Sequence, residues 1–225
     1  MSDEERWSAV DRYISQMLVQ PDHALEQALR SCDEAGLPAI SVSPAHGKLL
    51  HLMARMVAAR RILEIGTLGG YSTIWLARAL PAGGKLITLE VEARHAEVAQ
   101  KNLARAELAD SVEIVIGRAL DTLPQLARDK RGPFDFVFID ADKPSIKEYF
   151  EWSLKLSRPG SVIVVDNVIR RGAVVDAASK DESVQGVRRF NEMLSREKRV
   201  TATAIQTVGV KGYDGFCVAR VLDAP

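Results

Sequence analysis

Four acidic residues stand where apolar runs of the chain end. They are Glu64, Glu90, Asp140 and Asp166. Runs of Val, Ile, Leu and Phe are typical of strands buried on both faces of a parallel sheet, and the carboxyl ends of such strands share one edge, where ligands bind. Polar residues also end buried strands merely to avoid burial, but that explanation suits one acid better than four. We therefore expect the four carboxylates to lie along one functional site.

The two later acids predict a metal site. Asn167 directly follows Asp166, so the site would offer the carboxylates of Asp140 and Asp166 and one amide oxygen. Oxygen donors without histidine or thiolate favour a hard divalent cation, Mg²⁺ before Mn²⁺ or Ca²⁺. Lys143 lies three residues past Asp140, and we expect it to act there as a general base once the ion lowers its pKa. A surface salt bridge is the alternative role for this lysine.

A glycine-rich loop lies between the first apolar run and a helical pattern. Gly66, Gly69 and Gly70 allow a tight turn that brings backbone close to a ligand. The spacing differs from the G-x-G-x-x-G dinucleotide fingerprint, and Glu64 before the first glycine suits an ammonium group better than a pyrophosphate. Glu90 lies where doubly wound folds place the acid that binds a ribose diol. The loop therefore predicts a nucleoside ligand, with a βα turn that binds nothing as the alternative.

The elements that must position these residues alternate along the chain. The apolar run 61–65 and the helical pattern Tyr71–Leu80 are followed by four more pairs: 85–90 with 93–106, 112–117 with 119–129, 134–140 with 145–156, and 161–166 with 183–197. Two further runs, 201–208 and 215–222, are joined by a polar turn around Gly212 with no helix between them. The order predicts a doubly wound, Rossmann-like α/β fold, with a mostly parallel seven-stranded sheet and an antiparallel C-terminal hairpin.

The first part of the chain is predicted to be helical. Residues 1 to about 36 have the pattern of two amphipathic helices, residues 36–47 form a connector, and residues 48–59 form a helix that leads into the first strand. We expect one domain over residues 1–225, made of a helical extension (1–36) and an α/β core (37–225). The apolar face of the extension must be covered by its own domain, by the acceptor site or by a second subunit.

Composition excludes several classes of function. The 30 basic and 30 acidic residues sum to no net charge, which argues against nucleic acid as a partner. The acidic start is unlike a secretory leader, and no apolar run approaches the ~20 residues of a membrane span, so we expect a cytoplasmic protein with no membrane partner. Two cysteines predict no disulfide framework, and the four histidines have no zinc-site spacing.

These motifs resemble those of a known family over about residues 38–222. The similarity is to the metal-dependent class I S-adenosylmethionine O-methyltransferases, especially the catechol and caffeoyl-coenzyme A group in its bacterial and plant branch. The matching residues are Glu64-x-Gly66-x-x-x-Gly70, Glu90, Phe138-Ile-Asp-Ala-Asp-Lys143 and Val165-Asp-Asn167. The resemblance implies a metal held by Asp140, Asp166 and Asn167, and catalysis by Lys143 with Asp140. It also implies an S-adenosylmethionine pocket lined by Val42, Glu64, Gly66, Ser72, Glu90, Ala119 and Asp140.

The expected function is methylation of one hydroxyl of a vicinal pair on a small catechol-type phenol, by a protein that forms a homodimer. The chain departs from the family pattern at Pro38 and Asp142, which stand where the catechol enzyme has aromatic residues around its acceptor, and at Arg170-Arg171 after the Asp-Asn pair. A nicotinamide-dependent oxidoreductase is one alternative, although the second fingerprint glycine and a Tyr-x-x-x-Lys pair are missing. A methyltransferase-like binding module without catalysis is the other.

Two stretches near the site have more than one interpretation. Tyr149, Phe150 and Trp152 would wall an acceptor pocket or, as their helical spacing favours, pack in the core. Residues 168–181 would form either a mobile lid over the acceptor or a plain surface loop.

Overall fold

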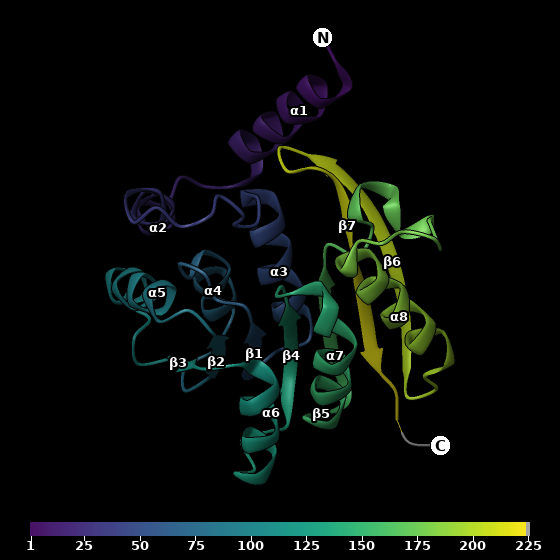
Figure 1. Cartoon of the computed structure of the whole chain (residues 1–225). Coiled ribbons are helices and arrows are strands. Elements are labelled where there is room, and N and C mark those ends of the chain that lie inside the picture. The colour runs from purple at the N-terminus through teal and green to yellow at the C-terminus, as the bar shows by residue number, and fades with distance from the viewer. Residues whose placement is uncertain (224–225) are drawn as a thin grey trace.

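The computed structural model describes residues 1–223, which form a seven-stranded sheet with helices on both faces (Figure 1). The strand order is β3-β2-β1-β4-β5-β7-β6, with parallel pairing from β3 to β5 and antiparallel pairing of β7 with both β5 and β6. The bounds are β1 (Arg61–Ile65), β2 (Lys85–Glu90), β3 (Val112–Ile116), β4 (Phe134–Ile139), β5 (Ser157–Asp166), β6 (Val200–Gly209) and β7 (Gly212–Val221). The predicted doubly wound fold with an antiparallel C-terminal hairpin is confirmed.

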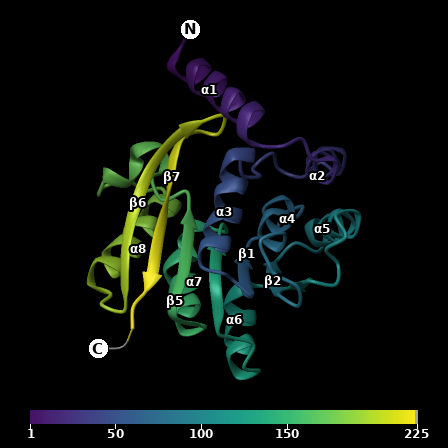
Figure 2. The same ribbon diagram turned by 180° about the vertical axis from the view of Figure 1, so that it is seen from behind.

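The helices lie in two layers because alternate residues of each strand point to opposite faces of the sheet. Leu63 and Ile65 belong to one core, with α6, α7 and α8, whereas Ile62 belongs to the other, with α2 to α5 (Figures 1 and 2). The bounds are α1 (Asp3–Leu18), α2 (His23–Glu34), α3 (Pro44–Met56), α4 (Tyr71–Ala77), α5 (Ala93–Arg105), α6 (Ala119–Arg128), α7 (Ile146–Lys155) and α8 (Glu182–Arg196), with 3-10 turns η1 (Lys143–Ser145) and η2 (Arg170–Val175). The carboxyl edge of the parallel strands, between the two helix layers, borders a cavity.

The helix before β1 starts earlier than the sequence predicted. The connector was expected to run to Gly47, but α3 begins at Pro44. The Ser43 hydroxyl accepts a hydrogen bond from the His46 N–H at 3.2 Å, and a proline at the first helical position needs no hydrogen-bond partner for its nitrogen. His46 therefore lies on a helix and not in a loop.

The C-terminal hairpin turns at a different place from the one predicted. Gly209 pairs with Gly212, so the turn is formed by Val210 and Lys211 and not by the residues around Gly212. The antiparallel pairing of β6 with β7 therefore extends to its last pair, Gly209 with Gly212. β5 is also longer than predicted, starting at Ser157, which pairs with Phe134 ahead of an irregularity in the register.

The two N-terminal helices differ in how they pack. Leu25, Ala28 and Cys32 of α2 are buried, whereas no residue of α1 is buried by the described chain. The Asp11 carboxylate of α1 accepts the N–H of Val210 at 2.8 Å, which joins α1 to the tip of the hairpin. Figure 1 shows α1 lying over that tip at the edge of the molecule.

Several expectations about the whole chain are left as predictions. Within residues 1–223 no helix is long and apolar enough to cross a membrane. The cytoplasmic location, the absence of nucleic-acid and membrane partners, and the division into residues 1–36 and 37–225 stay predictions, and the last two residues of that second range lie outside the described residues.

Candidate active site

A cavity of about 660 Å³ opens at the carboxyl ends of β1, β2, β4 and β5, which is a size suited to a small-molecule ligand. Eight of the predicted site residues line it: Val42, Gly66, Ser72, Glu90, Ala119, Asp140, Lys143 and Asn167. Two do not. Glu64 and Asp166 are buried behind the cavity wall. The structure therefore brings all ten predicted residues to one edge of the sheet, where eight line the cavity and two are buried beneath its wall.

The glycine loop allows β1 and β4 to approach each other closely at the cavity. Gly66 has φ +100°, and a Cβ atom there would lie 2.1 Å from the backbone oxygen of Asp140. No side chain fits in that space, so the position requires glycine. Gly70, with φ +83°, then precedes α4. The predicted tight turn is thus required by the contact between two strand ends.

Glu90 fastens the glycine loop to the end of β2. One oxygen of its carboxylate accepts the N–H groups of Thr67 and Leu68 at 3.1 and 2.8 Å, and the other accepts the N–H of Glu92 at 3.0 Å. His95, which the sequence analysis did not single out, lies 3.5 Å from that second oxygen. Because a carboxylate has about four acceptor positions, Glu90 retains capacity for a ligand hydroxyl.

Glu64 is fully buried and accepts three side-chain hydroxyls. Ser72, Thr73 and Thr88 donate to its carboxylate at 2.7, 2.5 and 2.7 Å. Burial raises the pKa of Glu64 to about 7 in spite of these donors. Since Ser72 lines the cavity and Glu64 does not, the hydroxyl of Ser72 stands between the carboxylate and the ligand space. The sequence correctly predicted that Glu64 lies at this edge of the sheet, but the prediction that its side chain lines the ligand pocket was wrong.

The buried state of Glu64 predicts a pH-dependent stability. The raised pKa means that the folded chain keeps a proton that the unfolded chain releases above about pH 4.5, so the free energy of unfolding falls as pH rises toward 7. Glu64→Gln removes this titration. Between pH 5 and pH 8 we expect the unmodified protein to lose about 2–3 kcal/mol more than the variant, measured by urea unfolding. Equal losses would mean that the hydroxyl donors keep Glu64 ionised.

The predicted metal ligands gather at the ends of β4 and β5. Asp166 is 6% exposed, and burial together with the charge of Asp140 raises the pKa of Asp166 to about 7. Its Oδ1 atom accepts a hydrogen bond from the N–H of Asn167 at 2.8 Å. Within residues 1–223 no three His, Cys, Asp or Glu side chains are grouped as a metal site, so a site here needs the amide of Asn167. Two crowded carboxylates short of a counter-charge fit a divalent cation.

His46 is a neighbour of this cluster that the sequence analysis missed. Its Nδ1 atom lies 3.8 Å from an oxygen of Asp166, and its ring stacks on Phe216 with centroids 5.3 Å apart. Burial lowers the pKa of His46, which favours the neutral ring. The Ser43-Pro44 helix start is the signal that would have placed it on α3.

Lys143 is buried beside Asp140. The lysine is 7% exposed, and its Nζ atom lies 3.1 Å from Oδ1 of Asp140. A lysine this deeply buried does not fit the alternative of a surface salt bridge. Helix α8 holds it from behind, because a Cβ atom on Gly186 would lie 2.1 Å from the backbone oxygen of Lys143. The packing of α8 therefore fixes the backbone from which this side chain extends.

The contact at Gly186 predicts that Gly186→Ala is harmful although alanine is the better helix former. The helix gains about 1 kcal/mol, but a methyl group pressed against a backbone oxygen forces α8 away at a cost of about 1–3 kcal/mol. We expect a lower unfolding temperature and a lower turnover, measured by thermal unfolding and initial rates. Asn191→Ala, at an exposed position of α8, is the control for helix propensity. A Gly186→Ala protein as active and stable as the control would contradict the packing.

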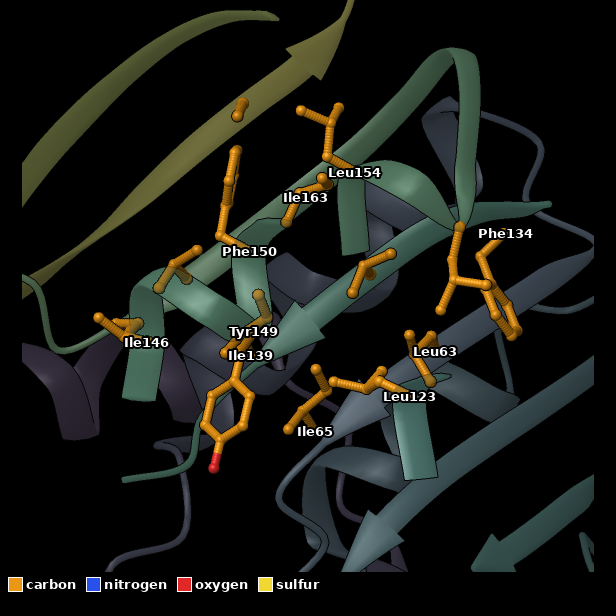
Figure 3. Packing of buried hydrophobic residues seen from close by; sticks show 14 of the residues in the cluster. Leu63, Ile65, Leu123, Phe134, Ile139, Ile146, Tyr149, Phe150, Leu154 and Ile163 are labelled. Atoms are coloured by element: carbon orange, nitrogen blue, oxygen red, sulfur yellow. The ribbon is translucent and has the colours of Figure 1, made fainter. Parts of the chain in front are cut away.

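The aromatic residues of α7 divide between core and cavity. Phe150 is fully buried, and Trp152 packs at the margin of the core with Lys155 over its ring. Tyr149 belongs to the core and also lines the cavity, and its hydroxyl donates to Asp142. Figure 3 shows that hydroxyl pointing away from the other labelled core side chains. Tyr149 thus forms part of the wall of the cavity, whereas Phe150 packs in the core.

The segment 168–181 is tied to its surroundings. One oxygen of Asp214 accepts the N–H groups of Ile169 and Arg170, each at 3.0 Å, and the Arg188 guanidinium donates to the backbone oxygen of Val174 at 2.6 Å. These hydrogen bonds fix the segment to β7 and α8. Its movement as a lid over the acceptor stays a prediction.

Known proteins match nearly the whole chain. A family model described as O-methyltransferase matches residues 15–221. A catechol O-methyltransferase of Niastella koreensis is 57% identical over 215 residues, covering 96% of this chain and 97% of that protein. The O-methyltransferase TomG from Streptomyces achromogenes, involved in tomaymycin synthesis and crystallised with S-adenosylmethionine, is 58% identical with a TM-score of 0.96, covering 99% of this chain and 100% of that one. An O-methyltransferase from Bacillus cereus, in complex with S-adenosylhomocysteine, is 56% identical with a TM-score of 0.95, covering 96% and 99%.

The sheet order and the cavity at its carboxyl edge define a Rossmann-like methyltransferase. The chain belongs to the O-methyltransferase family. This confirms the resemblance and the class of enzyme that the motifs predicted, and the matches give no support to a nicotinamide-dependent oxidoreductase.

Proposed function

We propose that the protein uses S-adenosylmethionine and a divalent cation to methylate one hydroxyl of a vicinal diol on a small phenolic acceptor of the catechol type. One observation carries the proposal. Lys143, Asp140 and Asn167 line the same cavity as the loop of Gly66 and the acid Glu90. A general base, oxygen donors for a metal and a nucleoside-binding loop thus face one space.

The methyl donor is assigned from the glycine-loop end of the cavity. Glu90 has acceptor capacity for a ribose diol, and Val42, Ser72 and Ala119 line the same region. The similar proteins from Streptomyces achromogenes and Bacillus cereus contain S-adenosylmethionine and S-adenosylhomocysteine. S-adenosylmethionine supplies a methyl group already activated on a sulfonium, so the residues of the chain have to provide a deprotonated acceptor oxygen and its alignment.

The cation is assigned to Asp140, Asp166 and Asn167. All three donors are oxygen atoms, and burial with like charge raises the pKa of Asp166, as expected where a cation normally balances two acids. A divalent ion held by these three residues would supply Lewis acidity that makes an acceptor hydroxyl easier to deprotonate. The name of the Niastella koreensis relative, a catechol O-methyltransferase, is consistent with a diol acceptor.

In the proposed mechanism the chain's own residues orient the acceptor and accept its proton. The Nζ atom of Lys143 is the acceptor for the proton of the attacking hydroxyl, and Asp140 at 3.1 Å stabilises the ammonium that forms. The buried surroundings of Lys143 exclude water and keep the pair aligned. Alignment of two reactants in such a cavity is worth up to about 7–11 kcal/mol of the barrier.

Methylation of 3,4-dihydroxyphenyl and monohydroxyphenyl acceptors with S-adenosylmethionine, with and without a chelator, tests the proposal. We expect product only from the diol, and only with metal present. Equal rates with chelator, or equal rates on the monohydroxy acceptor, would reject the metal-bound diol. Binding of S-adenosylmethionine without any methylation would favour the non-catalytic module.

The homodimer is part of the same proposal. Its support is the exposed apolar face of α1, where Val10, Tyr13 and Met17 are 51%, 64% and 63% exposed. Sedimentation of the full chain measures the assembly, and a monomer at micromolar concentration would contradict it.

A further inference from the structure

Arg170 is a cation in the wall of the cavity that has no partner among residues 1–223. Its guanidinium is not within 4.0 Å of any carboxylate of these described residues, and its Nε atom is buried without a hydrogen bond. Another partly buried arginine is paired, since Arg78 lies 2.6 Å from Asp22, and the more exposed Arg158 lies 2.6 Å from Asp135. A buried N–H group normally finds an acceptor, so the one that Nε of Arg170 lacks is expected from a ligand.

The position of Arg170 assigns it to the acceptor end of the cavity. Glu90 ends β2, and Arg170 follows Asn167 after β5, with β1 and β4 between them in the sheet. The nucleoside end and Arg170 therefore lie on opposite sides of the residues proposed to hold the metal. A ligand group that meets Arg170 belongs to the molecule that receives the methyl group.

Three acids around this end of the cavity already have partners. Asp140 pairs with Lys143, and Asp142 accepts the hydroxyl of Tyr149 and the N–H of Ser145. Asp214 accepts the N–H of Arg170 itself, at 3.0 Å, together with that of Ile169. That contact fixes the backbone of Arg170, whose φ is +54°. The backbone from which the guanidinium extends is thus held before a ligand arrives, which reduces the entropy lost on binding.

We propose that Arg170 binds a carboxylate of the acceptor, so that the preferred acceptor is an aromatic vicinal diol that also carries a carboxylate. This inference rests on the proposed function and narrows its substrate class. A guanidinium matches the geometry of a carboxylate with two parallel hydrogen bonds and keeps its charge at every working pH. The same contact orients the ring with its diol toward Asn167 and Lys143, because Arg170 and those residues line one cavity.

The test compares 3,4-dihydroxybenzoate with its methyl ester, which keeps the diol and removes the charge. We expect the unmodified protein to prefer the acid, and Arg170→Gln to lower kcat/KM for the acid by about 10- to 100-fold while the ester changes less than about threefold. Arg170→Lys keeps the positive charge but cannot donate two parallel hydrogen bonds, so its kcat/KM for the acid should fall less than that of Arg170→Gln. Arg171→Gln is the matched control, since Arg171 is exposed, carries the same charge and does not line the cavity.

A second measurement separates this inference from the proposed function. Calorimetric titration of the S-adenosylhomocysteine complex with acid and ester reads the carboxylate contact even where no methyl transfer occurs. A tenfold weaker affinity of Arg170→Gln for the acid alone supports the inference. Equal losses for acid and ester, or a preference of the unmodified protein for the ester, would overturn it, while methylation of uncharged diols would leave the proposed function intact. Thermal unfolding of each variant identifies a loss of fold.

Discussion

Lys143→Ala is expected to lower kcat for methyl transfer by about 10²- to 10⁴-fold while S-adenosylmethionine binds as before. The lysine is buried next to Asp140 at the end of the cavity away from Glu90, so its removal takes away the proposed proton acceptor and leaves the nucleoside end untouched. Initial rates with a diol acceptor give kcat, and calorimetry gives the affinity for the methyl donor.

Lys143→Arg is the matched variant for this prediction. Arginine keeps the positive charge beside Asp140 but does not release its proton at neutral pH. We expect this variant to be nearly as slow as the alanine variant, and both to recover part of the rate at high pH, where more of the acceptor is already ionised. A loss of less than tenfold in Lys143→Ala, or near-normal turnover in Lys143→Arg, would remove the role of general base.

Asp166→Asn is expected to abolish the response of activity to added Mg²⁺ and to weaken binding of the ion by at least about 100-fold. The substitution keeps the shape of a buried side chain but removes one of the two carboxylates proposed to balance the ion. Activity with and without chelator measures the first effect, and calorimetric titration of the protein with metal alone measures the second. Asp142→Asn, an acid that lines the cavity outside the proposed ligand set, is the control.

The metal-free stability of Asp166→Asn distinguishes a ligand from a merely structural residue. Because burial and the charge of Asp140 raise the pKa of Asp166, its ionisation destabilises the fold; the cost grows as pH rises from the ordinary carboxyl range toward the raised pKa and is fully present above it. Without metal at pH 8 the variant should therefore unfold at a higher temperature than the unmodified protein, and added Mg²⁺ should stabilise only the unmodified protein. A variant that is less stable at pH 8 and still responds to Mg²⁺ would assign Asp166 to packing alone.

Strand positions were predictable because each parallel strand is buried on both faces and so reads as a continuous apolar run. That pattern placed Glu90, Asp140 and Asn167 at one edge, and the structure has them in the wall of one cavity. The direction of a side chain was not predictable from the run alone. Glu64 precedes Ile65, which points into the core of α6 to α8, so Glu64 points to the opposite face, beneath Ser72.

Features that depend on distant residues could not be predicted from local pattern. The arrangement of His46 needs both Asp166 and Phe216, which come from β5 and β7. The free guanidinium of Arg170 is recognisable only once the partners of every neighbouring acid are known. The hairpin turn was misplaced for the same reason, since pairing across ten residues of each strand, and not the local preference of Gly212, decides where the chain reverses.

The hydrogen bond between Asp11 and the N–H of Val210 joins residues 199 positions apart in the chain. During translation α1 leaves the ribosome well before its anchor on the hairpin is made. Until then this amphipathic helix has its contacts with α3 but none with the hairpin, and its apolar side is open to chaperones. A nascent chain that stops before β6 would lack these hairpin contacts, so α1 settles on the hairpin only after β6 and β7 have been made.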